Sequence, residues 1–229
     1  MFVGWMGCGS ARGGVIPPSV LARSMFFVRH GEAEHNPLLV KANFKSKDPS
    51  EINAVLCREA RSIVNPKLTE KGREQAAALG KKMQAEGRRF DLCITTPLAR
   101  AIETSHLAFG AVAAKFMITA DAVESATPKL AGPQRGHSKE DTIKMFPFAA
   151  EWDLSMIRED GPEPNWVLGE AIEPTEDAGG RCGPAYLNPL PAEDRIAPLA
   201  AWLKERPEAA IVVVGHSGVF DKLLGLNMA

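Results

Sequence analysis

The sequence predicts a three-layer α/β/α sandwich with a mostly parallel central sheet. Short apolar runs typical of buried strands alternate with segments whose apolar residues recur every three or four positions, as on one face of a helix. Strands joined through helices are typical of parallel sheets, because each helix returns the chain to the same edge. The predicted strands are Met25–Val28, Asp91–Thr95, Phe116–Thr119 and Ile211–Val214, of which the last is entirely β-branched.

Cap residues and apolar stripes predict the helices between these strands. Thr69 is a typical N-cap, and a stripe of apolar residues follows it to about Glu86. Thr96-Pro97 combines a cap residue with a first-turn proline and predicts a helix that carries Arg100 in its first turns. Further helices are predicted after Ser138, which pairs with Asp141 in a capping pattern, and around Ile196, Leu199, Ala200 and Leu203.

We expect a single domain over residues 25–229, with long insertions at about 37–66 and 147–191. The first insertion is irregular and polar, with at most short helices, and the second is a loop dense in Pro, Gly, Trp and acidic residues. Residues 1–24 are rich in glycine and lack acidic side chains, which predicts a disordered arm on a cytoplasmic protein. The alternative is an organelle location, with the arm as the remnant of a targeting segment.

Composition excludes several classes of partner. The formal net charge of −1 argues against nucleic acid or an anionic membrane as the main partner, although it is compatible with a small basic pocket. No apolar stretch approaches the roughly 20 residues of a membrane helix. The four cysteines form no C-x-x-C pair and match neither a zinc site nor a disulfide framework, so we expect a reducing compartment. The sequence leaves the oligomeric state open.

Polar residues that suit phosphate chemistry follow three of the predicted strands. Arg29 and His30 end the first, Arg100 follows the second, and His216 ends the last. Because ligands bind outside the carboxyl ends of parallel strands, we expect these side chains to converge at one edge. Arginine matches phosphate oxygens, and neutral imidazole is a nucleophile toward phosphorus. Each residue alone has an ordinary alternative: a structural histidine after a strand, a surface arginine, or a histidine that caps a turn.

Four ordered motifs resemble the histidine phosphatase superfamily, in its phosphoglycerate mutase-like branch. Arg29-His30-Gly31-Glu32-Ala33-Glu34-His35-Asn36 resembles the signature R-H-G-x-x-x-x-N. The other three motifs are Leu68-Thr69-Glu70-Lys71-Gly72-Arg73-Glu74-Gln75-Ala76, Thr95-Thr96-Pro97-Leu98-Ala99-Arg100-Ala101-Ile102-Glu103-Thr104 and Val214-Gly215-His216-Ser217-Gly218. The resemblance runs from about residue 25 to 225 and implies the phosphoglycerate mutase-like form of the predicted sandwich.

The resemblance also implies a role for each matching residue. His30 would attack phosphorus and carry the phosphoryl group, while Arg29, Arg100 and His216 would line the pocket and stabilise charge on the phosphoryl oxygens. Asn36 would donate a further hydrogen bond to the phosphate; its ordinary alternative is a turn residue before Pro37.

A general acid is needed to protonate the leaving alkoxide. One branch of the superfamily has an H-D pair at the second histidine, but here the pair is His216-Ser217. The other branch has a glutamate after the third strand, a placement that Glu124 matches, with Asp121 as the nearest competitor. A carboxyl beside bound phosphate should have a raised pKa, which suits a proton donor. The alternative for Glu124 is a solvated loop residue.

Weaker similarities point to a plant and fungal subgroup. They are Phe146-Pro147, Asp153-Leu154-Ser155-Met156-Ile157 and Trp166. Arg135 lies where that subgroup has basic residues and is a candidate substrate contact, although a surface loop arginine is the preferred interpretation. His35 lies close to His30, but no carboxylate–histidine pattern accompanies it, so we predict no metal and no other cofactor.

These observations predict a phosphatase that hydrolyses a phosphorylated small molecule through a phosphohistidine. Two alternatives remain. The first is a phosphoglycerate mutase-type isomerase, which the sequence favours less because the aromatic segment that follows Asn36 in such mutases is replaced by Pro37–Ala42. The second is a catalytically silent member that binds phosphate or protein. Specificity would lie in the two insertions.

Overall fold

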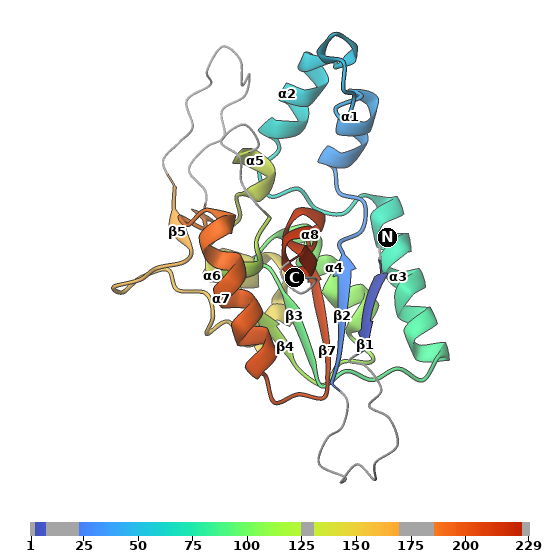
Figure 1. Cartoon of the computed structure of the whole chain (residues 1–229), viewed down its shortest axis with the longest axis vertical. Helices are drawn as coiled ribbons and strands as arrows, with labels where there is room; N and C mark the ends of the chain where they lie inside the picture. The colour runs from blue at the N-terminus through green and yellow to red at the C-terminus, as the bar shows by residue number, and fades with distance from the viewer. Residues whose placement is uncertain (1–2, 8–22, 125–130, 170–185, 226–229) are drawn as a thin grey trace.

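The computed structural model of the protein describes residues 3–7, 23–124, 131–169 and 186–225. The central sheet has the strand order β1-β2-β7-β3-β4 (Figure 1). Its strands are β1 (Val3–Gly7), β2 (Ser24–Arg29), β3 (Leu92–Thr95), β4 (Phe116–Ile118) and β7 (Ala210–Gly215). Neighbours among β2, β7, β3 and β4 pair in parallel, and β1 runs antiparallel to β2 at the edge. The predicted architecture is therefore confirmed.

The central strands are buried on both faces, which is why they are continuous apolar runs rather than alternating ones. In β7, Ile211 and Val213 belong to one core cluster, whereas Val212 and Val214 belong to the cluster on the opposite face. Phe27 of β2 faces the first cluster, and its neighbours Phe26 and Val28 face the second.

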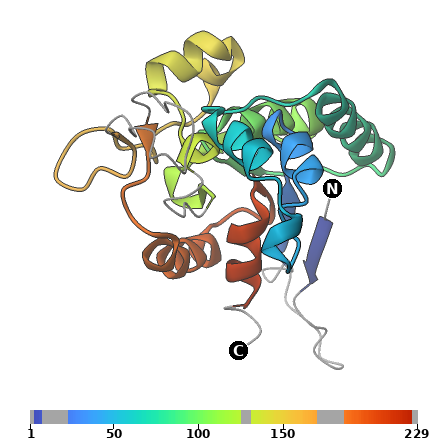
Figure 2. The ribbon, with the colours of Figure 1, turned by 90° about the horizontal axis from the view of Figure 1, so that it is seen from above.

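Two pairs of helices cover these faces, with the sheet between them (Figure 2). α3 (Glu70–Ala85) and α4 (Ala99–Phe109) contribute to the core on the Val212 face. α7 (Ala192–Glu205) and α8 (Ser217–Gly225) contribute to the core on the Ile211 face. This arrangement supplies the three layers that the sequence predicts.

Two of the predicted caps form and one does not. Thr69 Oγ1 accepts a hydrogen bond from the Gly72 N–H at 3.0 Å, and Ser138 Oγ accepts one from the Asp141 N–H at 3.0 Å, which starts α6 (Lys139–Met145). The predicted cap at Thr96 is wrong, because α4 begins only after Leu98. The Thr96 hydroxyl instead lies 3.1 Å from Nε2 of His216.

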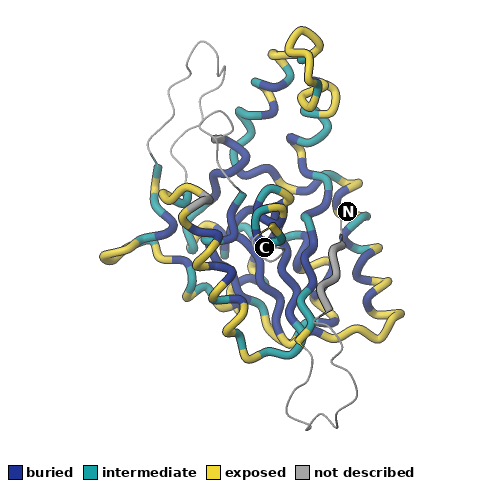
Figure 3. The backbone as a smooth tube through the Cα atoms, viewed as in Figure 1, coloured by how far each residue is buried: buried dark blue, intermediate teal, exposed yellow. Residues whose placement is uncertain are grey.

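The first insertion contains short helices, as expected, and the second contains more structure than the predicted loop. Residues 37–66 hold most of α1 (His35–Lys41), then η1 (Pro49–Glu51) and α2 (Ala54–Ser62), whose outer ends are exposed (Figure 3). The second insertion holds η4 (Pro147–Glu151) and an antiparallel pair formed by β5 (Val167–Leu168) and β6 (Tyr186–Leu187). Residues 170–185 of this insertion lie outside the described part.

The prediction of a disordered N-terminal arm is wrong for Val3–Gly7, because these residues form β1. Without β1, strand β2 would pair only with β7, and the backbone groups on its other edge would lack strand partners. β1 supplies those partners. Residues 1–2 and 8–22 of the predicted arm lie outside the described part. Among the described helices, none is long and apolar enough to cross a membrane.

Two glycines allow the chain after β2 to approach the start of α3. A Cβ on Gly31 would lie 2.6 Å from the Gly72 carbonyl oxygen, and a Cβ on Gly72 would lie 2.0 Å from the Glu32 carbonyl oxygen. Both contacts involve backbone, which cannot rotate away as a side chain can. The close approach fixes the backbone immediately after His30, and the His30 N–H itself donates to the Gly215 carbonyl at 3.0 Å.

Gly72→Ala tests this close approach. Alanine favours a helix by about 1 kcal/mol over glycine, but the clash with Glu32 should outweigh that gain. We expect the free energy of unfolding to fall by about 1–3 kcal/mol in urea titrations. Gly225→Ala is the matched control, since nothing lies within 4 Å of its Cβ position in α8. Equal stability of Gly72→Ala and the wild type would contradict the packing argument.

Candidate functional site

The predicted strand ends meet at one edge of the sheet. β2 and β7 are neighbours in register, with Arg29 opposite Gly215, so the residues that follow them lie side by side. The imidazole rings of His30 and His216 have centroids 5.2 Å apart. β3 pairs with β7 on its other side and leads to α4, which brings in Arg100. Three of the predicted site residues are thus in direct proximity.

His30 is buried and held as one neutral tautomer. Its Nδ1 lies 2.7 Å from the Gly31 carbonyl oxygen, which can only accept, so Nδ1 carries the hydrogen. Its Nε2 accepts a hydrogen bond from Nε of Arg100 at 3.2 Å and therefore presents a lone pair. Burial, followed by the charge of Arg100, holds the pKa of His30 well below its ordinary value. The imidazole is neutral at physiological pH.

Arg100 is a guanidinium that is only 1% exposed and that reaches three parts of the fold. Besides His30, it donates from Nη1 to the Pro133 carbonyl at 2.6 Å, and its Nη2 lies 3.5 Å from Nδ1 of His216. Burial lowers its pKa to about 10, while the carboxylate of Glu124 acts in the opposite direction. Arg100 therefore stays positively charged at neutral pH.

His216 is fully buried beside this cation. Its Nδ1 faces Arg100, a donor, so Nε2 carries the hydrogen toward the Thr96 hydroxyl. Burial lowers the pKa of His216 well below its ordinary value, and Arg100 lowers it further. Glu124 lies near the same ring atom, with Oε2 at 4.0 Å from Nδ1 of His216.

Glu124 rather than Asp121 lies next to His216. A Cβ on Gly218 would lie 2.5 Å from Oε1 of Glu124, so the carboxylate lies against the first turn of α8 as well as near His216. The carboxylate of Asp121 is engaged elsewhere, because its Oδ1 accepts from Nδ2 of Asn165 at 3.0 Å. Of the two candidates for a proton donor, only Glu124 is placed to act at this site.

Asn36 has a local role in the fold. Its Oδ1 accepts from the Ala33 N–H at 2.8 Å, and its Nδ2 lies 3.1 Å from Nε2 of His35. Because the amide nitrogen carries two hydrogens, the contact with His35 uses only one of them. The predicted contact of Asn36 with a phosphate stays a prediction.

His35 and Arg29 bring buried donors to the same region. His35 is 7% exposed, and burial together with Arg100 and Arg29 lowers its pKa to about 3. Nδ1 of His35 and Nε of Arg29 are both buried and have no hydrogen-bond partner among the described residues. Since Nε2 of His35 faces the Asn36 amide, Nδ1 carries its hydrogen. These N–H groups suit an anion and not a cation, and the described residues contain no group of three or more metal-ligating side chains.

Several supporting residues were not found from the sequence. Thr96 orients His216, and the Gly31 N–H donates to Oγ1 of Thr104 at 3.1 Å. Thr96 could have been suspected from its position after β3, but Thr104 could not, because its partner is distant in sequence. Arg135 was expected at the surface, but it is only 3% exposed. It follows α5 (Ala131–Gln134), where a Cβ on Gly132 would meet the Arg61 carbonyl at 2.1 Å, so this segment packs closely on α2.

The fold and the site together define a class: an α/β protein with neutral histidines and arginine at the carboxyl edge of a parallel sheet. The family model of the histidine phosphatase superfamily (branch 1) matches residues 25–228, and the chain belongs to this superfamily. The plant and fungal subgroup stays a prediction. Phe146 and Trp166, which suggested it, are buried in a third core cluster beside α4.

Curated relatives and solved structures are similar to parts of the chain. A 2,3-bisphosphoglycerate-dependent phosphoglycerate mutase of Streptococcus agalactiae is 36% identical over 38% of this chain and 30% of its own length. The enzyme of that name from Mesorhizobium japonicum is 27% identical over 74% of this chain and 69% of its own. Phosphoserine phosphatase of Entamoeba histolytica has a TM-score of 0.43 at 18% identity, covering 89% of this chain and 79% of its own.

The buried histidines predict a pH dependence of stability. The pKa values of His30, His35 and His216 lie below 6.5 in the folded protein, so the unfolded chain binds more protons below that pH. Because protons then bind preferentially to the unfolded chain, the free energy of unfolding should fall as the pH drops below about 6.5. The expected fall is up to about 1.4 kcal/mol per pH unit for each histidine.

Urea unfolding between about pH 7.5 and pH 5 measures this slope. His35→Gln removes one titrating group and should reduce the slope by close to one proton, because the pKa of His35 is lowered to about 3. A slope that is the same in His35→Gln as in the wild type would contradict the assignment of a neutral buried imidazole at this position.

Proposed function

We propose that the protein is a phosphatase that hydrolyses a phosphomonoester through a phosphohistidine on His30. The observation that carries the proposal is the tautomer of His30. The Gly31 carbonyl holds the hydrogen on Nδ1, so that Nε2 presents its lone pair beside the Arg100 guanidinium. A neutral imidazole with a fixed lone pair next to a permanent cation is suited to attack a phosphorus atom that the cation binds.

The first proposed step transfers the phosphoryl group to the enzyme. Nε2 of His30 bonds to phosphorus as the ester P–O bond breaks, and the leaving oxygen takes a proton from Glu124. The attack places positive charge on the imidazole ring, and the bond from Nδ1–H to the Gly31 carbonyl becomes charge-assisted. Arg100 exchanges its contact with Nε2 for one with a phosphoryl oxygen, Arg29 adds a second positive donor, and the neutral ring of His216 lines the pocket.

The second proposed step returns the enzyme to its initial state. Water attacks phosphorus while Glu124, now ionised, takes a proton from it, and the N–P bond breaks. Orthophosphate leaves, His30 regains its lone pair on Nε2, and Glu124 is again protonated. The approach of Glu124 Oε2 to Nδ1 of His216 at 4.0 Å supports this assignment, because the ring of His216 lies next to that of His30.

A second candidate is phosphoglycerate mutase activity, which the names of the curated relatives favour. A mutase would return the phosphoryl group from His30 to the hydroxyl of a sugar acid rather than to water. The two activities share the first step and differ in the acceptor. Isomerisation of phosphoglycerate faster than hydrolysis of any monoester in a substrate panel would favour the mutase.

The role of His30 predicts the loss of a covalent intermediate in His30→Ala. We expect turnover of an aryl phosphate to fall by roughly 10³-fold or more, and the acid-labile, alkali-stable phosphoprotein seen after acid quench to disappear. His106→Ala is the control, since His106 stacks on Phe148 away from the site. Equal turnover in His30→Ala and the wild type would leave only a silent binding protein as the interpretation.

The role of Glu124 predicts a dependence on the leaving group. Glu124→Gln should slow phosphorylation of His30 by roughly 10²- to 10⁴-fold with an alkyl phosphate, whose alkoxide needs a proton. With dinitrophenyl phosphate, whose leaving group needs none, the first turnover should remain fast and phosphoenzyme should accumulate. Rapid-quench measurement of labelled enzyme separates the two steps. A uniform loss with both esters would remove Glu124 from the proton-transfer role.

A further inference from the structure

A further buried arginine, Arg195, lies apart from the histidines of the candidate site. Arg195 is in the first turn of α7 and is 4% exposed. A cation is unfavourable there for two reasons: burial removes it from water, and the helix dipole is positive at that end. Specific hydrogen bonds must offset both costs, and the partners of Arg195 show what the side chain holds in place.

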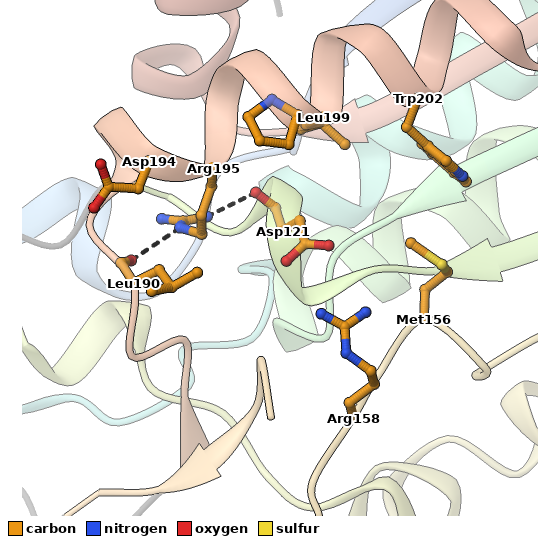
Figure 4. A pocket seen from close by; sticks show the side chains of 9 residues that line it. Asp121, Met156, Arg158, Leu190, Asp194, Arg195, Leu199 and Trp202 are labelled. Atoms are coloured by element: carbon orange, nitrogen blue, oxygen red, sulfur yellow. Dashed lines mark hydrogen bonds between the residues drawn. The ribbon is translucent and has the colours of Figure 1, made fainter. Parts of the chain in front are cut away.

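Arg195 donates to three backbone carbonyls. Its Nε donates to the Leu190 carbonyl at 3.0 Å, in the chain that leads into α7, and its Nη1 donates to the Asp121 carbonyl at 2.7 Å (Figure 4). Nη1 also donates to the Val123 carbonyl at 3.1 Å. Asp121 is the middle residue of η2 (Ala120–Ala122), and Val123 follows η2 immediately. One guanidinium therefore ties the start of α7 to the segment that follows β4.

That segment delivers Glu124 to the candidate site. Val123, whose carbonyl accepts from Arg195, is bonded covalently to Glu124, and the Glu124 carboxylate then lies 4.0 Å from His216. A carbonyl held one residue before a side chain fixes the direction in which that side chain leaves the backbone. Displacement of a reacting group by about 1 Å costs as much as 10²-fold in rate.

The segment that carries Glu124 lies beside a cavity, so its position depends on hydrogen bonds such as those from Arg195. A cavity of about 220 Å³ lies between η2 and α7, and its lining includes Asp121, Leu190, Arg195 and Trp202 (Figure 4). A loop next to a cavity is not confined there by close packing and can relax into the space when its hydrogen bonds are lost. Asn188 adds a further hydrogen bond to this segment, which Nδ2 donates to the Ala120 carbonyl at 3.0 Å.

We infer that Arg195 is a positioning residue for Glu124: its hydrogen bonds to the Asp121 and Val123 carbonyls aim the Glu124 carboxylate at the reacting group. The inference rests on the proposed role of Glu124 as proton donor. The three hydrogen bonds of Arg195 end on backbone carbonyls, so we place its action on Glu124 in the backbone that carries this residue. Its loss should therefore reproduce the loss of Glu124 in kind, and not the loss of His30.

Arg195→Lys tests the inference, because lysine keeps the charge but lacks the planar fork that reaches the three carbonyls. We expect phosphorylation by an alkyl phosphate to slow by roughly 10- to 100-fold, whereas the first turnover with dinitrophenyl phosphate stays within about two-fold of the wild type. Phosphoenzyme should accumulate with the second ester, as in Glu124→Gln. Arg206→Lys is the matched control, because Arg206 caps the other end of α7 and pairs with Glu208.

A double variant protects the test against simple loss of folding. In the Glu124→Gln background, Arg195→Lys should have no further effect on the alkyl phosphate, since its route of action is already removed. Equal losses with the two esters, additive losses in the double variant, or no loss at all would each overturn the inference. Failure of the proposed function gives a different result, namely wild-type enzyme that forms no phosphohistidine.

Discussion

The buried guanidinium of Arg100 is the constraint around which the site is built. It joins His30, the Pro133 carbonyl and His216 through its three nitrogens, and it stays charged although burial lowers its pKa to about 10. A cation in that position requires acceptors, so each imidazole turns a lone pair toward it and is neutral. Burial and this one arginine together keep both histidines neutral.

The sheet topology makes this arrangement available. β2 and β7 come from opposite ends of the domain and pair in parallel, which places Arg29 opposite Gly215 and the two histidines just beyond them. β3 on the other side of β7 leads directly into α4 and Arg100. The parallel order thus brings three strand ends together, so that arginine donors suited to phosphoryl oxygens lie beside the Nε2 lone pair of His30.

The sequence was sufficient for the parts that local pattern determines. Apolar runs predict β2 and β7, and His30 and His216 follow them directly, so the convergence of the site could be predicted. Contacts made across the chain could not. The sequence already favoured Glu124, but it could not show that Asn165 of the second insertion engages the carboxylate of Asp121. It also could not show the burial of Arg135, which follows the segment α5 that packs on α2. β1 was missed because edge pairing depends on a distant partner and not on its own residues.

Arg100 and Arg195 illustrate two uses of a buried cation. Both donate to backbone carbonyls, which satisfy hydrogen bonds without cancelling charge. For Arg100 the retained charge points toward His30, where the proposed chemistry needs it. For Arg195 the three carbonyls matter instead, because they fix the path of the chain that leads to Glu124. A backbone carbonyl accepts a hydrogen bond without neutralising the first cation, and beside the second cation it anchors the chain that carries Glu124.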